Sequence, residues 1–364
     1  MTSLPAHEFH ASLDARFTSV NGAEFVDHYG DALAEHRALR ESAGVIDLSS
    51  RSRLCLTGAD RVRFLNGQVT NDVNILAPGR GCYAALVNAK GKMQADLFIH
   101  CLADELLLDF EPGLASSVAA RFEKFIIADD VLVVDVAPHY GLLSVQGPRA
   151  AEALGKLGLS ITPPPQSLHS LAVKDAMLGE IICANVPRGA SAGFDLFVPT
   201  PALAAVADKL MAAAKELGGR AVGWQALETL RIEAGLPRFG ADMDETTLPP
   251  EAGLEARAIS YSKGCYIGQE VIARIRTYGQ VARALRGLRL PHDLPALPQH
   301  GDKLLHEGKE VGFLTSAVRS PTGPGNVALG YVRRECNQPG TALTLRTAAG
   351  EFPVRIVPLP FLEK

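Results

Sequence analysis

The chain has 364 residues, of which 47% are hydrophobic and 21% are charged, so it can bury substantial cores and is not disordered. Its length predicts two or three domains. The formal net charge of −4 argues against general nucleic-acid binding, which needs a basic face, although it leaves room for a local basic patch.

The N-terminal residues lack the cationic start and apolar run of a secretory signal, and no stretch approaches the roughly 18–20 apolar residues that span a bilayer. The six cysteines include no Cys-x-x-Cys pair, which favours a reducing compartment over a disulfide framework. We therefore expect a cytoplasmic protein without membrane contact. No His-Glu-x-x-His, Walker or Gly-x-Gly-x-x-Gly motif supports a metal, nucleotide or dinucleotide enzyme, and we assign no metal site.

The first half of the chain predicts a mixed domain with an antiparallel sheet. Residues 52–57 alternate as a strand does, and Asp60 is placed to cap a short helix that ends near Asn66. Three apolar runs with turn residues between them follow, at 81–88, 93–101 and 104–110. A helix and two strands come next, over 113–127, 131–136 and 141–146. This order is typical of an α+β domain.

Pro163-Pro164-Pro165 fits neither a helix nor a central strand and indicates a boundary or an exposed crossover. Two strands and two helices are predicted beyond it, over 180–186, 193–199, 201–217 and 222–234. After about residue 280, short strands punctuated by Gly and Pro predict a small β-barrel or sandwich, near 284–290, 310–319, 327–332, 341–346 and 352–357. We therefore expect an N-terminal segment packed on the core and three domains, at 1–50, 51–160, 161–280 and 281–364.

The segment Ser-Lys-Gly-Cys-Tyr-Ile-Gly-Gln-Glu at 262–270 carries the strongest chemical signal. Two glycines bracket Cys265 and allow another molecule to approach closely. A helix predicted to begin near Gly268 would put the cysteine just before a helix N-terminus, and Lys263 adds a cation, so both favour a thiolate. A lone cysteine is also often a small buried hydrophobic residue. From these residues alone, both interpretations stay open.

Lys-Gly-Cys-Tyr-x-Gly-Gln-Glu resembles the signature of the YgfZ family, folate-binding proteins implicated in iron–sulfur enzyme maintenance and, in some members, tRNA modification. Further motifs occur in the order that this family uses, at 67–73, 88–93 and 231–237. The resemblance covers roughly residues 45–290. It implies an α+β, aminomethyltransferase-like folate-binding fold, with the C-terminal β-barrel matched by position. The same landmarks resemble the glycine-cleavage aminomethyltransferases, and the Pro-Glu-Ala-Gly-Leu run at 250–254 is closer to that branch.

The resemblance implies tetrahydrofolate, or a one-carbon derivative of it, as the cofactor, in a pocket that the domain at 161–280 completes. Asp195 matches the carboxylate that grips the pterin by accepting two adjacent N–H groups, although it could be an ordinary outward-facing strand residue. Arg231 matches an arginine that would hold the carboxylate end of folate, but an ion pair with Glu228 is equally possible. Tyr83 and Asn88 are assigned to the same pocket.

Aminomethyl transfer needs a carboxylate beside the folate nitrogen, and the transferases supply it from an Asp-Asp pair. Here Ala95 stands at the first of these positions and Asp96 at the second, while Lys92 replaces a glycine of the preceding hairpin. This partial loss, together with the Cys265 motif, favours a YgfZ-type protein over a transferase. The predicted catalytic residues are Cys265, Lys263 and Asp96.

The leading hypothesis is therefore a tetrahydrofolate-binding accessory factor for iron–sulfur protein assembly or repair, with client or assembly proteins as transient partners. Whether the chain is itself an enzyme stays open. The alternative is a folate-dependent aminomethyltransferase or demethylase acting on a small amine, with Asp96 as its charge-stabilising group. A third hypothesis is a module that docks on RNA such as tRNA, or on protein, through the arginines at 274, 276, 283 and 286.

Overall fold

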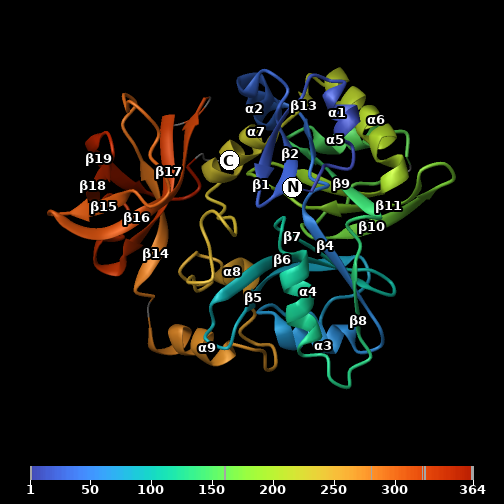
Figure 1. Ribbon diagram of the computed structural model, residues 1–364, viewed down its shortest axis with the longest axis horizontal. Helices are drawn as coiled ribbons and strands as arrows, with labels where there is room; N and C mark the ends of the chain where they lie inside the picture. Colours follow the sequence, from blue (N-terminus) through green and yellow to red (C-terminus); the bar gives the residue numbers. More distant parts are fainter. Residues whose placement is uncertain (1, 160, 280, 322, 324, 362–364) are drawn as a thin grey trace. The chain divides into compact units, whose positions relative to one another are not determined.

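The computed structural model describes residues 2–159, 161–279, 281–321, 323 and 325–361. The chain forms two compact units, each assembled from separate segments. Unit 1 consists of Met1–Leu86, Ala95–Leu227 and Ser262–Tyr266, and unit 2 of Val87–Gln94, Glu228–Tyr261 and Ile267–Lys364. The helices and strands are labelled in Figure 1. The domain boundaries expected near residues 50, 160 and 280 stay predictions.

A six-stranded sheet with the order β10-β11-β12-β9-β3-β13 forms one half of unit 1. Its strands are β3 (Gly44–Asp47), β9 (Tyr140–Gln146), β10 (Ser170–Asp175), β11 (Gly179–Asn185), β12 (Gly193–Pro199) and β13 (Arg220–Ala221). Helices α5 (Ala150–Gly155) and α6 (Leu203–Glu216) cover one face, where alternate strand residues such as Leu143 and Leu196 pack with Leu203 (Figure 1). The intervening strand residues point to the other face.

The second sheet of unit 1 has five strands in the order β5-β6-β7-β4-β8. They are β4 (Ser52–Thr57), β5 (Arg80–Val87), β6 (Met93–Cys101), β7 (Leu106–Phe110) and β8 (Leu132–Asp135). Helices α3 (Arg61–Gln68) and α4 (Ala115–Glu123) cover one of its faces through Phe64 and Phe122, which pack with Leu97 and Leu108. This sheet therefore also has one apolar face under helices and one face without them.

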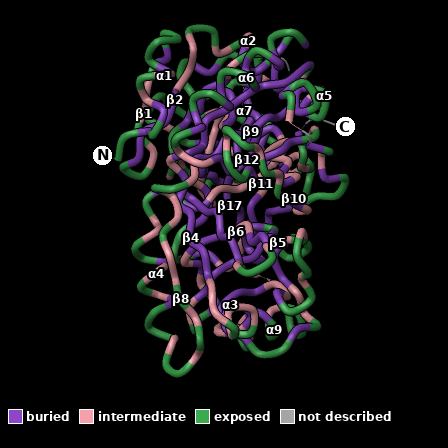
Figure 2. Tube along the Cα trace, turned by 90° about the vertical axis from the view of Figure 1, so that its right-hand side faces the viewer, coloured by how far each residue is buried: buried purple, intermediate pink, exposed green. Residues whose placement is uncertain are grey.

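The N-terminal residues of unit 1 form α1 (His7–Ala11), a hairpin of β1 (Arg16–Val20) and β2 (Ala23–His28), and α2 (Ala32–Glu41). Phe25 on this hairpin contacts Trp224 at the start of α7 (Trp224–Glu233), with 4.7 Å between ring centroids. Figure 2 shows β4, β6 and β9 in the buried part of the chain, whereas α4 buries only Val118 and Phe122. In the described part of the chain, no helix is long and apolar enough to cross a membrane.

Unit 2 contains a closed six-stranded barrel with the order β14-β17-β16-β15-β18-β19. Its strands are β14 (Arg283–Arg289), β15 (Lys303–His306), β16 (Lys309–Ser320), β17 (Gly325–Arg333), β18 (Ala342–Thr347) and β19 (Gly350–Val357). Leu288, Leu304 and Ile356 fill the interior. The unit also includes α8 (Glu255–Ala258), α9 (Gln269–Tyr278) and the short helix η2 (Arg334–Cys336). The predicted fold class, α+β with a C-terminal β-barrel, is confirmed.

Candidate functional site

Polar side chains of unit 1 gather on the two sheet faces that carry no helices. On β6, the odd-numbered residues of 95–101 pack under α3 and α4, so strand alternation turns Asp96 and His100 to the opposite face. On β12, the same alternation turns Asp195 and Phe197 away from α5 and α6. The rings of His100 and Phe197 meet edge to face, with 5.5 Å between centroids. The two polar faces therefore lie against each other.

Asp195 is 1% exposed, and its carboxylate is already bound within the chain. Ser144 Oγ donates to Oδ1 at 2.6 Å, while Arg188 donates to Oδ1 from Nε at 3.3 Å and to Oδ2 from Nη2. Gln146 donates to Ser144 Oγ at 2.8 Å and accepts the backbone N–H of Arg188 at 2.9 Å, so it holds both partners. A pterin could accordingly reach both oxygens of Asp195 only after the Arg188 side chain had moved.

Arg188 also joins the two sheets. Its Nη2 lies 3.4 Å from Asp109 Oδ2 on β7. Asp109 accepts two further bonds from Arg51 Nε, at 2.9 and 3.0 Å, and Arg51 pairs with Glu111. Burial by itself would raise the pKa of Asp109, but Arg51 and Arg188 outweigh burial and hold this pKa below its ordinary value. Two arginines thus favour the ionised form of the buried Asp109.

Asp96 has a different environment on the same face. It is 9% exposed, and the Tyr83 hydroxyl donates to its Oδ2 at 2.7 Å. Its Oδ1 has no hydrogen-bond partner among the residues that the structure describes. Burial, helped by the nearby charge of Glu111, raises the pKa of Asp96 to about 6. A carboxyl of this kind can exchange a proton near neutral pH, and its unbonded oxygen can accept a proton or a hydrogen bond from a ligand amine.

Lys263 is buried, and its ammonium group binds the chain at the end of α3. Its Nζ donates to the carbonyls of Asn66, Val69 and Asn71 at 2.7, 2.8 and 2.6 Å. Carbonyls at a helix C-terminus lack donors within the helix, so the lysine supplies donors that the backbone cannot. Burial lowers the pKa of Lys263 to about 8. The structure thus places this predicted catalytic residue on three carbonyls, where it positions the segment that carries Cys265.

Cys265 is exposed and belongs to the Ser262–Tyr266 segment of unit 1. Helix α9 begins at Gln269 in unit 2, with Gly268 as its N-cap in the left-handed region at a φ of 85°. The helix start predicted near Gly268 is therefore confirmed. Activation of the Cys265 thiol by that helix and by neighbouring positive charge stays a prediction.

Arg231 lies on the part of α7 that belongs to unit 2. It binds Glu228 from Nε at 3.1 Å and from Nη2 at 2.8 Å, pairs with Asp242, and donates to Ser316 Oγ at 2.9 Å. The guanidinium is buried in this network, and although burial lowers the pKa of Arg231, the carboxylates of Asp242 and Glu228 outweigh burial and raise it above the ordinary arginine value. The ion pair with Glu228, one of the two interpretations of the sequence, is thus present.

Asn88 occupies the hairpin between β5 and β6, in unit 2. Its Oδ1 accepts the backbone N–H groups of Lys90 and Lys92 at 2.9 and 3.1 Å, which closes the turn. Of the predicted site residues, unit 1 therefore brings Tyr83, Asp96 and Asp195 onto its polar faces, whereas Asn88 and Arg231 are bonded within unit 2.

The sequence motifs did not predict the residues that surround Asp96 and Asp195, namely Arg51, Asp109, Glu111, Ser144, Gln146, Arg188 and His100. Asp109 could have been found, because it interrupts the apolar run 106–110, and a charge inside a buried strand needs a counter-charge. His100 gave no such signal. Both of its ring nitrogens lack hydrogen-bond partners among the described residues, and burial lowers its pKa.

Known proteins match the chain over its whole length. Residues 6–263 match the GCVT N-terminal domain, and residues 283–363 match the glycine cleavage T-protein C-terminal barrel domain. An aminomethyltransferase of Saccharopolyspora erythraea is 30% identical, over 99% of this chain and 98% of the relative. One of Halothermothrix orenii is 28% identical over 100% of both chains. The glycine cleavage system aminomethyltransferase T of Bartonella henselae superposes with a TM-score of 0.90 at 26% identity, over 100% of this chain and 98% of that one.

These similarities overturn the leading hypothesis from the sequence, an accessory factor for iron–sulfur proteins, and favour the aminomethyltransferase alternative. The error has a physical cause on β6. The missing acid at position 95 seemed to remove catalytic chemistry, but Ala95 packs in the apolar cluster under α3 and α4. An apolar residue there leaves the opposite face, with Asp96, unchanged.

Both domain models and full-length relatives therefore agree with the geometry, and the chain belongs to the glycine cleavage T-protein (GCVT) family.

Proposed function

We propose that this chain is a tetrahydrofolate-dependent aminomethyltransferase that acts on a small amine. The observation that carries the proposal is Asp96, a buried carboxyl with a pKa of about 6 that is oriented by Tyr83 and keeps one oxygen without a partner among the described residues. Full-length similarity to proteins named aminomethyltransferase supports the same reaction class.

Tetrahydrofolate supplies the nitrogen that carries the one-carbon group. In the proposed reaction, Asp96 Oδ1 takes up and returns a proton of the substrate nitrogen and stabilises the positive charge that develops next to it. Tyr83 keeps the carboxyl in one orientation through its bond to Oδ2. The low exposure of Asp96 limits water at this oxygen, which strengthens its interaction with a cationic nitrogen.

The pterin end of the folate requires a rearrangement in this proposal. Asp195 can accept two pterin N–H groups only when Arg188 releases it. Arg188 already lies 3.4 Å from Asp109, so its guanidinium can shift onto that carboxylate and keep an ionic partner. Asp195 would then hold the pterin, as its match to the family position suggests. Within the family, the motif at 263–270 resembles that of the YgfZ-type branch, whereas the proposed reaction rests on Asp96 and on the full-length similarity to aminomethyltransferases.

The proposal is tested by incubating the purified protein with methylenetetrahydrofolate and a panel of small amines, beginning with ammonia. The amount of tetrahydrofolate formed is measured by chromatography. It reports transfer of the methylene carbon to the amine, which involves no change in oxidation level. We expect amine-dependent turnover that falls by about a hundredfold or more in Asp96→Asn, because the variant cannot exchange the proton.

Asp104→Asn is the matched control, because Asp104 is exposed in the turn between β6 and β7. It should keep the rate of the unchanged protein. Equal rates for Asp96→Asn and Asp104→Asn would remove Asp96 from the reaction, and absence of amine-dependent turnover across the panel would count against the transferase itself.

A further inference from the structure

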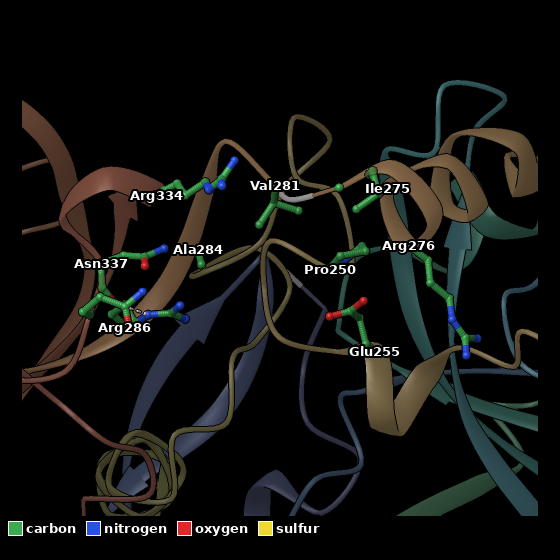
Figure 3. Close-up of a pocket in the computed structure, with 11 residues that line it drawn as sticks. Pro250, Glu255, Ile275, Arg276, Val281, Ala284, Arg286, Arg334 and Asn337 are labelled. Atoms are coloured by element: carbon green, nitrogen blue, oxygen red, sulfur yellow. Dashed lines mark hydrogen bonds between the residues drawn. The ribbon is translucent and has the colours of Figure 1, made fainter.

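A pocket of about 630 Å³ lies in unit 2 beside one end of the barrel, lined by β14, by the segment around η2 and by residues from the region of α8 and α9. Leu288 on β14 packs in the barrel interior, so strand alternation puts Ala284 and Arg286 on the same inward face, closer to this end. Figure 3 shows Arg286 and Arg334 entering from the barrel side, with the Glu255 carboxylate of α8 across from them. Barrel mouths are places where small-molecule sites often form.

The Arg286 guanidinium is fixed in place by the backbone. Its Nε donates to the carbonyl of Asn337 at 2.8 Å, and its Nη1 donates to the carbonyl of Leu285 at 2.9 Å. Among the described residues, neither Arg286 nor Arg334 forms an ion pair, and the second terminal nitrogen of Arg286 makes no hydrogen bond. Burial lowers the pKa of Arg286, which reflects a charge partly removed from water. Such a charge is stabilised by an anion.

The charges on the pocket wall are unequal. Three arginines line it, at positions 276, 286 and 334, and Glu255 is the one acid among the lining residues. Glu255 accepts the Tyr261 hydroxyl at 3.0 Å, and the Arg276 guanidinium lies 4.0 Å from the centroid of the Tyr261 ring. These two side chains are therefore engaged with Tyr261, and positive charge from Arg286 and Arg334 remains directed at the pocket.

We propose that this pocket binds a small organic anion, whose carboxylate or phosphate group is held by Arg286 and Arg334. The volume falls in the range of small-molecule sites, roughly 300–1,000 Å³, and is far larger than one inorganic ion needs. Ile275 and Val281 offer apolar contact to the body of such a ligand, and the side-chain amide of Gln338 offers a further hydrogen bond. The proposal uses none of the residues of the unit 1 cluster and is independent of the proposed function.

Calorimetric titration of the full chain tests the proposal with three probes at constant ionic strength: phenylphosphate, phenylacetate and inorganic phosphate. We expect one saturable site that binds an organic probe more tightly than inorganic phosphate, because the apolar wall contributes. The tighter of the two organic probes identifies the preferred anionic group. Arg286→Gln and Arg334→Gln should each weaken that binding by about tenfold or more, because each removes a charged donor.

Arg333→Gln is the matched control, because it removes the same charge from the exposed neighbour of Arg334 that does not line the pocket. It should bind the probe as the unchanged protein does. Arg334 is itself exposed, so its variant keeps the test valid if Arg286→Gln fails to fold. No heat with any probe at millimolar concentration, or equal weakening by Arg333→Gln and Arg334→Gln, would overturn the proposal.

Discussion

Three hydrogen bonds reach the Asp195 carboxylate, two of them from Arg188. Arg188→Gln would leave Asp195 and Asp109 without a shared buried cation, so we expect the free energy of unfolding to fall by about 3 kcal/mol. The same change should lower the dissociation constant for tetrahydrofolate by about tenfold, because a pterin would no longer have to displace an arginine. Urea unfolding and calorimetric titration measure the two effects.

Arg149→Gln serves as the control for this substitution. Arg149 is partly exposed, pairs with Glu152 and donates one hydrogen bond to the Leu217 carbonyl, so its loss should lower stability much less than the loss of Arg188 and leave folate binding alone. Unchanged or weaker tetrahydrofolate binding in folded Arg188→Gln would show that Asp195 is not where the pterin is held.

The raised pKa of Asp96 makes stability depend on pH in a defined direction. Its folded-state pKa of about 6 lies above the ordinary 3.8, so the folded protein holds this proton more tightly than the unfolded chain does. The stability that the proton contributes is present below pH 3.8 and is lost as the pH rises through 6. The amide of the variant cannot titrate, so Asp96→Asn does not lose this stability. Between pH 4 and 7, its free energy of unfolding should therefore rise by up to about 3 kcal/mol relative to that of the unchanged protein.

Urea unfolding at several pH values measures this difference, with Asp104→Asn as the comparison. Other carboxylates titrate alike in all three proteins and cancel in the difference. If the free energies of unfolding of Asp96→Asn and the unchanged protein depended on pH in the same way, Asp96 would titrate at its ordinary pKa and be open to water.

At the scale of single elements, the C-terminus of α3 depends on a residue almost two hundred positions away. Lys263→Met removes three hydrogen bonds from the carbonyls of Asn66, Val69 and Asn71 and leaves those carbonyls without this donor. We expect a loss of about 2–4 kcal/mol in the free energy of unfolding and faster amide hydrogen exchange at the end of α3. Cys265→Ser, in the same segment but exposed, should change stability by less than about 0.5 kcal/mol.

If both variants lost the same stability, the whole segment rather than the lysine would hold α3. If only Lys263→Met lost activity as well as stability, while Cys265→Ser kept both, the motif at 262–270 would owe its importance to anchoring rather than to thiol chemistry.

Elements with a strong side-chain period were predictable. The strand over 52–57 has the bounds of β4, and the strand over 93–101 has those of β6, because alternating or apolar residues fill one buried face. The helix predicted over 113–127 is shorter, ending as α4 at Glu123. Strands β10 and β15 were missed, as were β1, β2, β3 and β13, for which no range was predicted. β10 is an edge strand whose alternating residues Leu171 and Val173 are only partly buried, and β15 is only four residues long, so the apolar signal of each is weak.

At the scale of the whole molecule, the sequence predicted the fold class but not the grouping of charges. Asp96 and Asp195 could be named from motifs, whereas Arg188 could not, because its partners lie on β7 and β12 and depend on how two sheets face each other. The predicted function was wrong because it rested on the octapeptide and on the missing acid at position 95, whereas the similarity to aminomethyltransferases extends over the whole chain. A local motif determines only a few contacts, whereas the reaction depends on side chains that strands far apart in the sequence bring together.

The path of the chain has a consequence for biosynthesis. Five changes of unit occur along the sequence, after residues 86, 94, 227, 261 and 266. Unit 1 is therefore incomplete on the ribosome until Tyr266 has emerged, and the lysine that holds the end of α3 arrives last. Neither unit is a continuous stretch of sequence, so neither can be expressed alone by truncating the chain at one position. The two apolar clusters under α5–α6 and α3–α4 lie within residues 6–217, so both cores can form on the nascent chain before the segment at 262–266 arrives to complete the unit.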